Sequence, residues 1–418
     1  MKVKTPILLS LLCVIAGLNS LSAQTSQTAH AAGRIPAKAK AMPTAAPAVN
    51  EYAAIDEKAL RMPDSSATTP ESMAAYINAS FKSDREKARA AFIWIATNIQ
   101  YDIGNMFALN FYETREEKVA KALKSRKGIC ANYAALFNAI CSKAGIRCYE
   151  VEGYTKQNGF TDYIPHAWCI AYVDTDWYIF DPTWGSGYVS NAKFIPKVNN
   201  YYFMTRPSDI IHSHMPFDYL WQCLYYPVTN QQFYEGKVAE DKTTPYFNFP
   251  DSISSYEKLE KTDAYADEAR RIEKNGVKNS MIFDRLQHLR REVEVERQNE
   301  RVGFYNSAIT DYNRSTSDFN AYIDYYNKQF KPVKPDTAIR EMLNTAAGHL
   351  KAAASKLDQI KQPDAATANM IASFRKQIGD LSAHVDEQQA WLDKYFAKGK
   401  MGRKMMFTKY TWFGVPLN

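Results

Sequence analysis

The stretch KGICANYAALFNAICSKAG, residues 127–145, places a cysteine, Cys130, at the start of a predicted helix. Gly128 permits the tight turn before it, and Gly145 is the natural stop after it. Unpaired N–H groups and the helix dipole stabilise a thiolate at this end of a helix. Cys130 is therefore a candidate nucleophile, and the alternative is a small apolar residue that begins a core helix.

The segment HAWCIAYVDTDWYIFDPTWG, residues 166–185, supplies a base and a carboxylate. A two-residue turn at 174–175 puts Asp181 opposite Trp168 and diagonal to His166, on one face of a hairpin. Asp181 can then hold one nitrogen of the His166 ring while the other nitrogen faces the Cys130 thiol. The three residues together predict a Cys-His-Asp catalytic triad.

Further residues near this triad have predicted roles in substrate binding. We expect Trp168 and Trp184 to wall the cleft, with a place in the core as the alternative for each. Gly128 would leave room for the substrate backbone. His212 and His214 have no carboxylate or thiol at metal-ligand spacing nearby, so we assign them to polar contacts in the core or a loop.

Residues 51–240 have a mixed α and β pattern. Thr69 before Pro70 and the SDRE motif at 83–86 predict two helix starts. Strands are expected at 147–154, 166–173 and 177–180. The predicted fold class is α+β, with the Cys130 helix packed on an antiparallel sheet.

From 241 to 418 the chain is charged and helical in pattern. Apolar residues recur at alternating three- and four-residue steps in three segments, 305–330, 343–360 and 371–392, which prolines separate. This rhythm predicts an antiparallel three-helix bundle or coiled coil without a catalytic constellation.

The first 50 residues predict a processed leader and a linker. Residues 1–23 combine Lys2 and Lys4 with an apolar run and a small residue, as a cleavable signal peptide of bacterial type does. Residues 24–50, rich in alanine, proline, serine and threonine, are predicted to be a flexible spacer. We therefore expect an exported protein, periplasmic or at the cell surface, without a transmembrane span.

Charge and cysteine content exclude several classes of function. The formal charge falls from +7 to +5 when Lys2 and Lys4 leave with the leader, which is too mild for nucleic-acid binding. No cysteine pair has the C-x-x-C spacing of a zinc finger, so we expect neither a metal nor a cofactor. The odd number of cysteines outside the leader leaves open whether a disulfide forms among four of them: Cys141, Cys148, Cys169 and Cys223.

Three stretches together resemble the transglutaminase-like superfamily, in the branch typified by kyphoscoliosis peptidase. They are RKGICANY at 126–133, the hairpin segment at 166–185, and YYFMTRPSDIIHSHMPFDYLWQ at 201–222. AFIWIATNIQYD at 91–102 fits the helix before the catalytic region. The resemblance implies a papain-like thiol fold with Cys130, His166 and Asp181 as its triad, and acyl transfer on amides through a thioester.

A protein or peptide is the substrate that this resemblance implies, and export makes cell-wall peptides available. We expect hydrolysis, as in a peptidase or amidase. The alternatives are a protein-crosslinking transglutaminase and a non-catalytic peptide-binding scaffold that retains the triad. The helices of 241–418 are expected to dock a protein partner or to mediate self-association.

Overall fold

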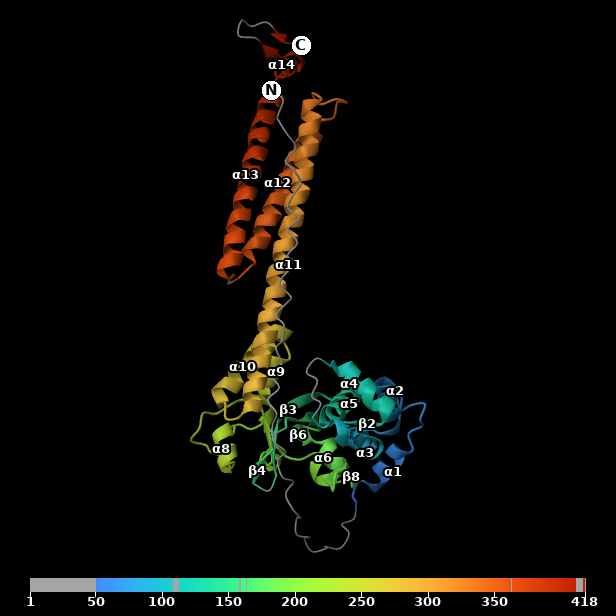
Figure 1. Cartoon of the computed structure of the whole chain (residues 1–418). Coiled ribbons are helices and arrows are strands. Elements are labelled where there is room, and N and C mark those ends of the chain that lie inside the picture. The colour runs from blue at the N-terminus through green and yellow to red at the C-terminus, as the bar shows by residue number, and fades with distance from the viewer. Residues whose placement is uncertain are drawn as a thin grey trace. The chain divides into compact units, whose positions relative to one another are not determined.

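The computed structural model describes residues 50–107, 113–157, 159–162, 164–361, 363–410 and 416–417. The chain divides into two compact units, one covering Ala39–Glu294 and one that includes Val295–Asn418 (Figure 1). The predicted leader 1–23 lies outside the described residues, as does the predicted spacer except for its last residue, Asn50.

Helices at the start of the first unit begin where their capping residues predict. Thr69 caps α2 (Pro70–Ser80) and Ser83 caps α3 (Asp84–Asn98), each in a reciprocal capping box. These caps confirm the two predicted helix starts. The neighbouring helices are α1 (Ala53–Leu60), α4 (Arg115–Ser125) and α5 (Cys130–Lys143).

A five-stranded antiparallel sheet forms the centre of the first unit. Four strands follow the order β4-β3-β5-β6, and β9 pairs with β3 beyond this path. The strands are β3 (Cys148–Gln157), β4 (Phe160–Thr161), β5 (His166–Val173), β6 (Asp176–Phe180) and β9 (His214–Pro216). Val173 pairs with Asp176, which confirms the predicted two-residue turn and its register.

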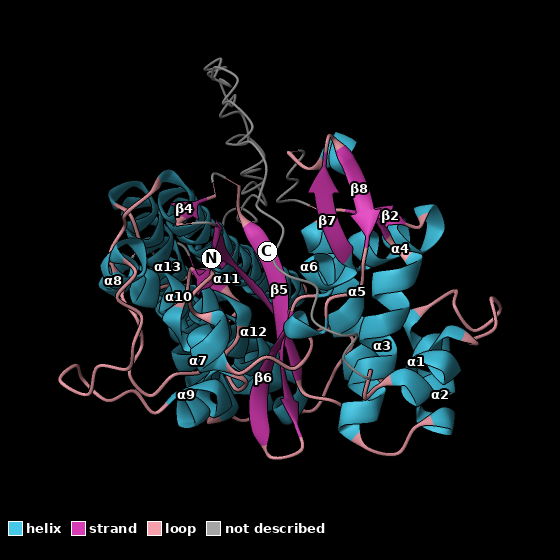
Figure 2. Ribbon diagram, turned by 90° about the horizontal axis from the view of Figure 1, so that it is seen from below, coloured by secondary structure: helices cyan, strands magenta, loops and turns pink. Residues whose placement is uncertain are grey.

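Alternating side chains of β5 serve two different cores. Ala167, Cys169 and Ala171 pack toward α5, whereas Trp168 and Ile170 pack on the other face. Helices α1–α5 cover the first face and α7–α10 the second (Figure 2). Both faces are buried because apolar residues occupy the odd and the even positions of this strand.

The connection after β6 builds a separate hairpin beside the sheet. Its strands are β7 (Gly187–Ser190) and β8 (Lys193–Pro196), preceded by α6 (Pro182–Ser186). A short parallel pair, β1 (Gln100–Tyr101) with β2 (Lys127–Gly128), holds the chain before α5. Short helical elements complete this region: η1 (Ile103–Asn105), η2 (Asn200–Tyr202), α7 (Pro207–Ile210), η3 (Tyr219–Gln222) and α8 (Asn230–Glu235).

The first unit extends further along the chain than the predicted domain boundary at 240. It includes α9 (Phe249–Tyr256), α10 (Lys261–Asn275) and α11 (Ser280–Asn327) as far as Glu294. Arg271 of α10 binds the buried carboxylate of Asp218, with Nη2–Oδ2 at 2.7 Å. Arg285 of α11 binds Glu152 of β3 at 2.8 Å. These ion pairs and the apolar faces of the helices join charged, helical sequence to the sheet.

The second unit is helical, as predicted. Val295 to Asn327 of α11, α12 (Asp336–Asp358) and α13 (Ala365–Phe396) lie side by side, with short connections between them (Figure 1). They bury one apolar core that contains the predicted positions Leu343, Leu350 and Phe374. After them come α14 (Lys400–Met405) and the pair β10 (Lys409–Tyr410) with β11 (Pro416–Leu417). Among the described helices of both units, none is long and apolar enough to span a membrane.

Candidate active site

Cys130 is the first residue of α5, and its neighbours fix that helix start in place. The Asn132 side chain accepts a hydrogen bond from Ile129 N–H at 3.0 Å and donates one to the Lys118 carbonyl at 3.0 Å. A β-carbon on Gly128 would lie 2.6 Å from the Asn132 Cβ. Glycine is therefore required here by packing against Asn132.

Asp181 lies at the end of β6 and collects four hydrogen bonds. Its Oδ1 accepts from the backbone N–H groups of Thr183 at 2.8 Å and Trp184 at 3.0 Å, which begin α6. Its Oδ2 lies 2.8 Å from Nε2 of His166 and 3.1 Å from Nε2 of His214. The side chain is fully buried. A buried carboxylate with this many donors has little freedom to reorient.

The His166 ring binds Asp181 and lies close enough to Cys130 for that residue to affect its pKa. Burial alone would lower the pKa of His166, but the adjacent Asp181 carboxylate and, to a lesser extent, Cys130 raise it to about 10. Since Nε2 is bound to Asp181, Nδ1 is the ring nitrogen left to face the thiol. The structure thus brings together the three residues of the predicted triad.

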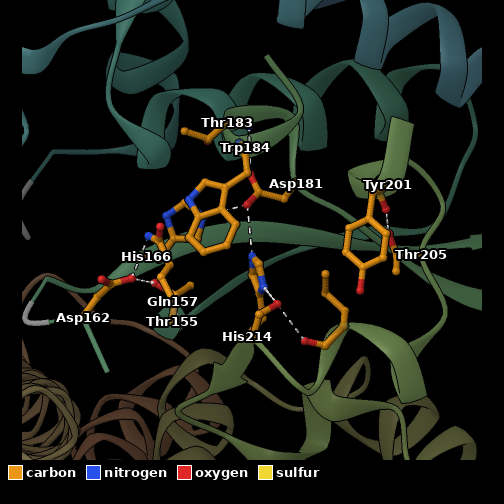
Figure 3. Close-up of polar contacts among 12 residues, drawn as sticks. Thr155, Gln157, Asp162, His166, Asp181, Thr183, Trp184, Tyr201, Thr205 and His214 are labelled. Atoms are coloured by element: carbon orange, nitrogen blue, oxygen red, sulfur yellow. Dashed lines mark hydrogen bonds and ion pairs between the residues drawn. The ribbon is translucent and has the colours of Figure 1, made fainter. Parts of the chain in front are cut away.

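Asp181 is ionised, although burial opposes its charge. Burial raises the pKa of a carboxyl group, but the charges and hydrogen bonds of His166 and His214 hold the pKa of Asp181 well below its usual range. An anionic Asp181 accepts only, so the Nε2 atom of each histidine must carry the proton it donates. Figure 3 shows both imidazole rings reaching this carboxylate.

His214 is a site residue that the sequence did not reveal. Burial is the main reason that its pKa is lowered, so its ring is neutral and Nδ1 accepts a hydrogen bond from Ser213 Oγ at 2.8 Å. β9 brings His214 to the site by pairing with β3. The assignment of His214 to polar contacts is thus correct in kind, but its partner is the triad carboxylate. Only this strand pairing, which joins residues about 60 positions apart in the chain, reveals that partner.

The ligand atoms of His166, Asp181 and His214 lie within 4.8 Å of one another, close enough for a metal ion. Both Nε2 atoms, however, already donate to the same carboxylate oxygen. Metal ligation requires a deprotonated imidazole nitrogen, whereas the raised pKa of His166 favours its protonated form. The two imidazole rings and the carboxylate are therefore held together by hydrogen bonds rather than arranged to bind a metal ion.

A cleft of about 830 Å³ opens beside the cluster of His166, Asp181 and His214. His166, Trp184 and Tyr101 are among the residues that line it. Cys130 is not in the lining, and its exposed fraction is 6%. Burial and then the charge of Cys130 raise the pKa of Tyr101. Cys130 thus affects the pKa of two residues of the cleft wall, His166 and Tyr101.

The two tryptophans and the glycine predicted to bind substrate lie in different surroundings. Trp184 lines the cleft, and its ring centroid is 5.4 Å from that of His166. Trp168 is 1% exposed, does not line the cleft, and stacks on His166 at 5.9 Å. Gly128 does not line the cleft either. Trp168 therefore supports the His166 ring from the core, which was the alternative for this residue, and Gly128 serves the turn before α5.

The five cysteines outside the predicted leader are all free and buried. Cys169 donates a hydrogen bond to the Ala134 carbonyl at 3.2 Å, which ties β5 to α5 behind the triad. Cys141 and Cys148 lie in the same core, and Cys223 lies on the other face of the sheet. The structure therefore contains no disulfide among these five residues.

Replacing His214 with phenylalanine is expected to slow alkylation of Cys130 by iodoacetamide about tenfold at pH 7. Phenylalanine keeps a ring against Trp184, whose centroid lies 4.7 Å away, but removes the donor that fixes Asp181. His166 then loses part of its orientation. Labelling rates followed by mass spectrometry test this, with the exposed His212 changed to phenylalanine as the control. Equal rates in the H214F and H212F variants would mean that His214 has no positioning role.

Comparison with known proteins agrees with this geometry. The sequence model of the transglutaminase-like superfamily matches residues 71–182. Kyphoscoliosis peptidase of Mus musculus is 36% identical over 159 residues, which is 36% of this chain and 24% of that protein. The Homo sapiens protein of the same name is 37% identical over 158 residues, 36% of this chain and 23% of that protein.

Hillarin of Drosophila melanogaster is 29% identical over 170 residues, 36% of this chain and 20% of that protein. The chain thus spans about a quarter or less of the length of these relatives. The superfamily match at 71–182 lies in the first unit and includes Cys130, His166 and Asp181.

Proposed function

We propose that this transglutaminase-like domain is a thiol enzyme that acts on peptide amides by acyl transfer through a thioester. Cys130 is the nucleophile, and His166 is the general acid and base. Asp181 orients the His166 ring and stabilises its protonated form. The relatives named kyphoscoliosis peptidase support a peptide substrate, and we extend that substrate class to this chain.

One observation carries the proposal: a fully buried carboxylate binds Nε2 of His166 at 2.8 Å and leaves Nδ1 for Cys130. A structural cysteine or histidine has no need of a buried anion that raises the imidazole pKa to about 10. Strongly perturbed groups beside a cleft are typical of a catalytic centre.

The reaction follows from the roles of these residues. The Cys130 thiolate attacks the carbonyl carbon of the amide, and the tetrahedral intermediate collapses as the C–N bond breaks. His166 donates its Nδ1 proton to the leaving amine. Water, deprotonated by His166, then attacks the thioester and releases the carboxylic acid and the thiol.

Two donors are available for the developing oxyanion. The Cys130 backbone N–H lies in the first turn of α5, where N–H groups have no partner within the helix. Tyr101 lines the cleft, and Cys130 is one of the groups that raise its pKa. We assign both as oxyanion donors, since each would strengthen its bond as negative charge develops.

We propose hydrolysis as the outcome of the thioester. A lysine side chain in place of water would give a crosslink, and a domain that only binds peptides would perform neither reaction. Export and a setting in the periplasm or at the cell surface, with cell-wall peptides as available amides, are part of the same proposal and rest on residues 1–23. For the helices of the second unit we propose a docking or self-association role.

Product analysis of a peptide pool tests this function. The chain without residues 1–23 is incubated with peptides from a denatured proteome, with and without methylamine, and products are identified by mass spectrometry. We expect new peptide termini that are absent when Cys130 is alanine. Methylamine adducts without cleavage would indicate a transferase. A pool unchanged by a protein whose Cys130 still reacts with iodoacetamide would indicate a binding domain.

A further inference from the structure

The charged groups that line the cleft are all cationic. Lys156, Lys197 and the protonated His166 belong to its wall, and no aspartate or glutamate occurs among its described lining residues. The Asp162 carboxylate does not line the cleft and accepts hydrogen bonds from Thr155 and from Gln157 Nε2 at 3.2 Å (Figure 3). The His166 cation is paired with the buried Asp181 carboxylate, so the positive charge that a peptide in the cleft meets comes from the two lysines.

The two lysines differ in how firmly they are held. Lys156 Nζ donates to the backbone carbonyls of Phe233 at 3.2 Å and Tyr234 at 3.1 Å, so its charge is fixed in place. Lys197 is exposed, and its side chain forms no ion pair with another residue that the structure describes. Its backbone N–H bonds to the Ser186 carbonyl at 2.9 Å, which anchors the residue beside the triad. Lys197 is thus free to bind an anion.

A buried hydroxyl group in the cleft wall also lacks a partner. Thr183 lines the cleft, is 6% exposed, and follows Asp181 by two residues. Its Oγ1 forms no hydrogen bond with any described residue. A buried hydroxyl without a partner is costly, so a ligand group in the cleft would relieve that cost.

The hairpin of β7 and β8 presents apolar side chains to the same cleft. Tyr188 and Val189 of β7 line it together with Val198, which follows β8, and their exposed fractions are 53%, 46% and 42%. Side chains of this kind gain free energy when a ligand covers them. The cleft thus offers an apolar wall next to an unpaired cation, as far as the described residues go.

We propose that the cleft selects acidic peptides, with a carboxylate side chain at Lys197 and an apolar side chain against Tyr188 and Val189. This inference rests on the proposed function, because it places the scissile amide at Cys130. Lys197 is the specificity residue, and Lys156 adds a fixed charge that repels cationic peptides.

Two electrophilic peptides test this selectivity separately from turnover. They are tripeptide chloromethyl ketones with the sequences Glu-Phe-Glu and Gln-Phe-Gln, which have nearly the same shape and differ in charge. We expect the acidic probe to alkylate Cys130 about tenfold faster at low ionic strength, with the preference shrinking as salt rises. Lys197→Glu should remove or reverse it. Lys193→Glu is the matched control, since Lys193 is exposed on β8 and does not line the cleft.

The possible outcomes distinguish a failure of the proposed selectivity from a failure of the proposed thiol enzyme. If both probes label Cys130 equally fast, or if K193E lowers the preference as much as K197E, the selectivity is refuted and the thiol enzyme stands. If neither probe nor iodoacetamide labels Cys130, the proposed function fails and the selectivity with it.

Discussion

Replacement of Cys130 with alanine is expected to reduce amide cleavage by about 10⁴-fold or more, because no other group can form the thioester. Selective labelling by iodoacetamide should disappear with it. The free energy of unfolding should change by less than about 1 kcal/mol, since one small buried group replaces another. Peptide mapping of the labelled protein and thermal denaturation measure the two effects.

Cys223 is a reference thiol of similar exposure. Its exposed fraction is 5%, close to the 6% of Cys130, and burial raises its pKa. Faster labelling of Cys130 than of Cys223 would therefore indicate an activated thiolate at Cys130 rather than better access. Cys223→Ala, far from the triad in the other core, should leave both cleavage and Cys130 labelling intact. Equal labelling of Cys130 and Cys223 would contradict an activated Cys130.

Replacement of Asp181 with asparagine is expected to lower the His166 pKa from about 10 to below its ordinary value of 6.5. The pKa of His166 falls because burial lowers it and the Asp181 anion is the first of the groups that raise it, so removing that anion leaves burial to dominate. In the native protein the imidazolium is lost only as pH rises through about 10. In the variant it is lost below pH 6.5, so cleavage at pH 7 should fall by about 10³- to 10⁴-fold.

The D181N variant also changes which nitrogen of His166 carries the proton. The introduced amide would keep its oxygen for the Thr183 and Trp184 N–H groups, so its NH₂ group would face the two histidines and donate to them. His166 would then carry its proton on Nδ1 and could not accept one from the thiol.

NMR titration of histidine-labelled protein measures this pKa directly, with the His166 signal assigned from a His166→Gln variant. Asp176→Asn is the control, because Asp176 lies at the opposite, exposed end of the same strand. An unchanged His166 titration in the D181N variant would show that Asp181 does not govern the ring.

The hairpin that joins His166 to Asp181 could be derived from residues 166–185 alone. A two-residue turn fixes the register, and register fixes which side chains share a face, so Asp181 had to lie diagonal to His166. The start of α5 at Cys130 is local in the same way, because a glycine, a cysteine and an apolar period of helical spacing occur in one short stretch. Such features depend on neighbours within a few residues.

The division of the chain was harder to predict from composition. Residues 241–294 are charged and helical in pattern, yet they pack on the first unit because their apolar faces join its cores and because Arg271 and Arg285 find acidic partners there. The pattern of a helix shows which face it buries but not the surface that covers that face.

The sequence by itself determined the helix that starts at Cys130, the two-stranded register behind His166 and Asp181, and the helical character of the second half of the chain. Only the tertiary structure decided that His214 shares the Asp181 oxygen, that Trp168 lies in the core while Trp184 lines the cleft, and that Gly128 makes room for Asn132. The reason is physical: turns, caps and periodicity follow from contacts between near neighbours, whereas these assignments depend on strands and loops that meet only after the chain has collapsed around two cores.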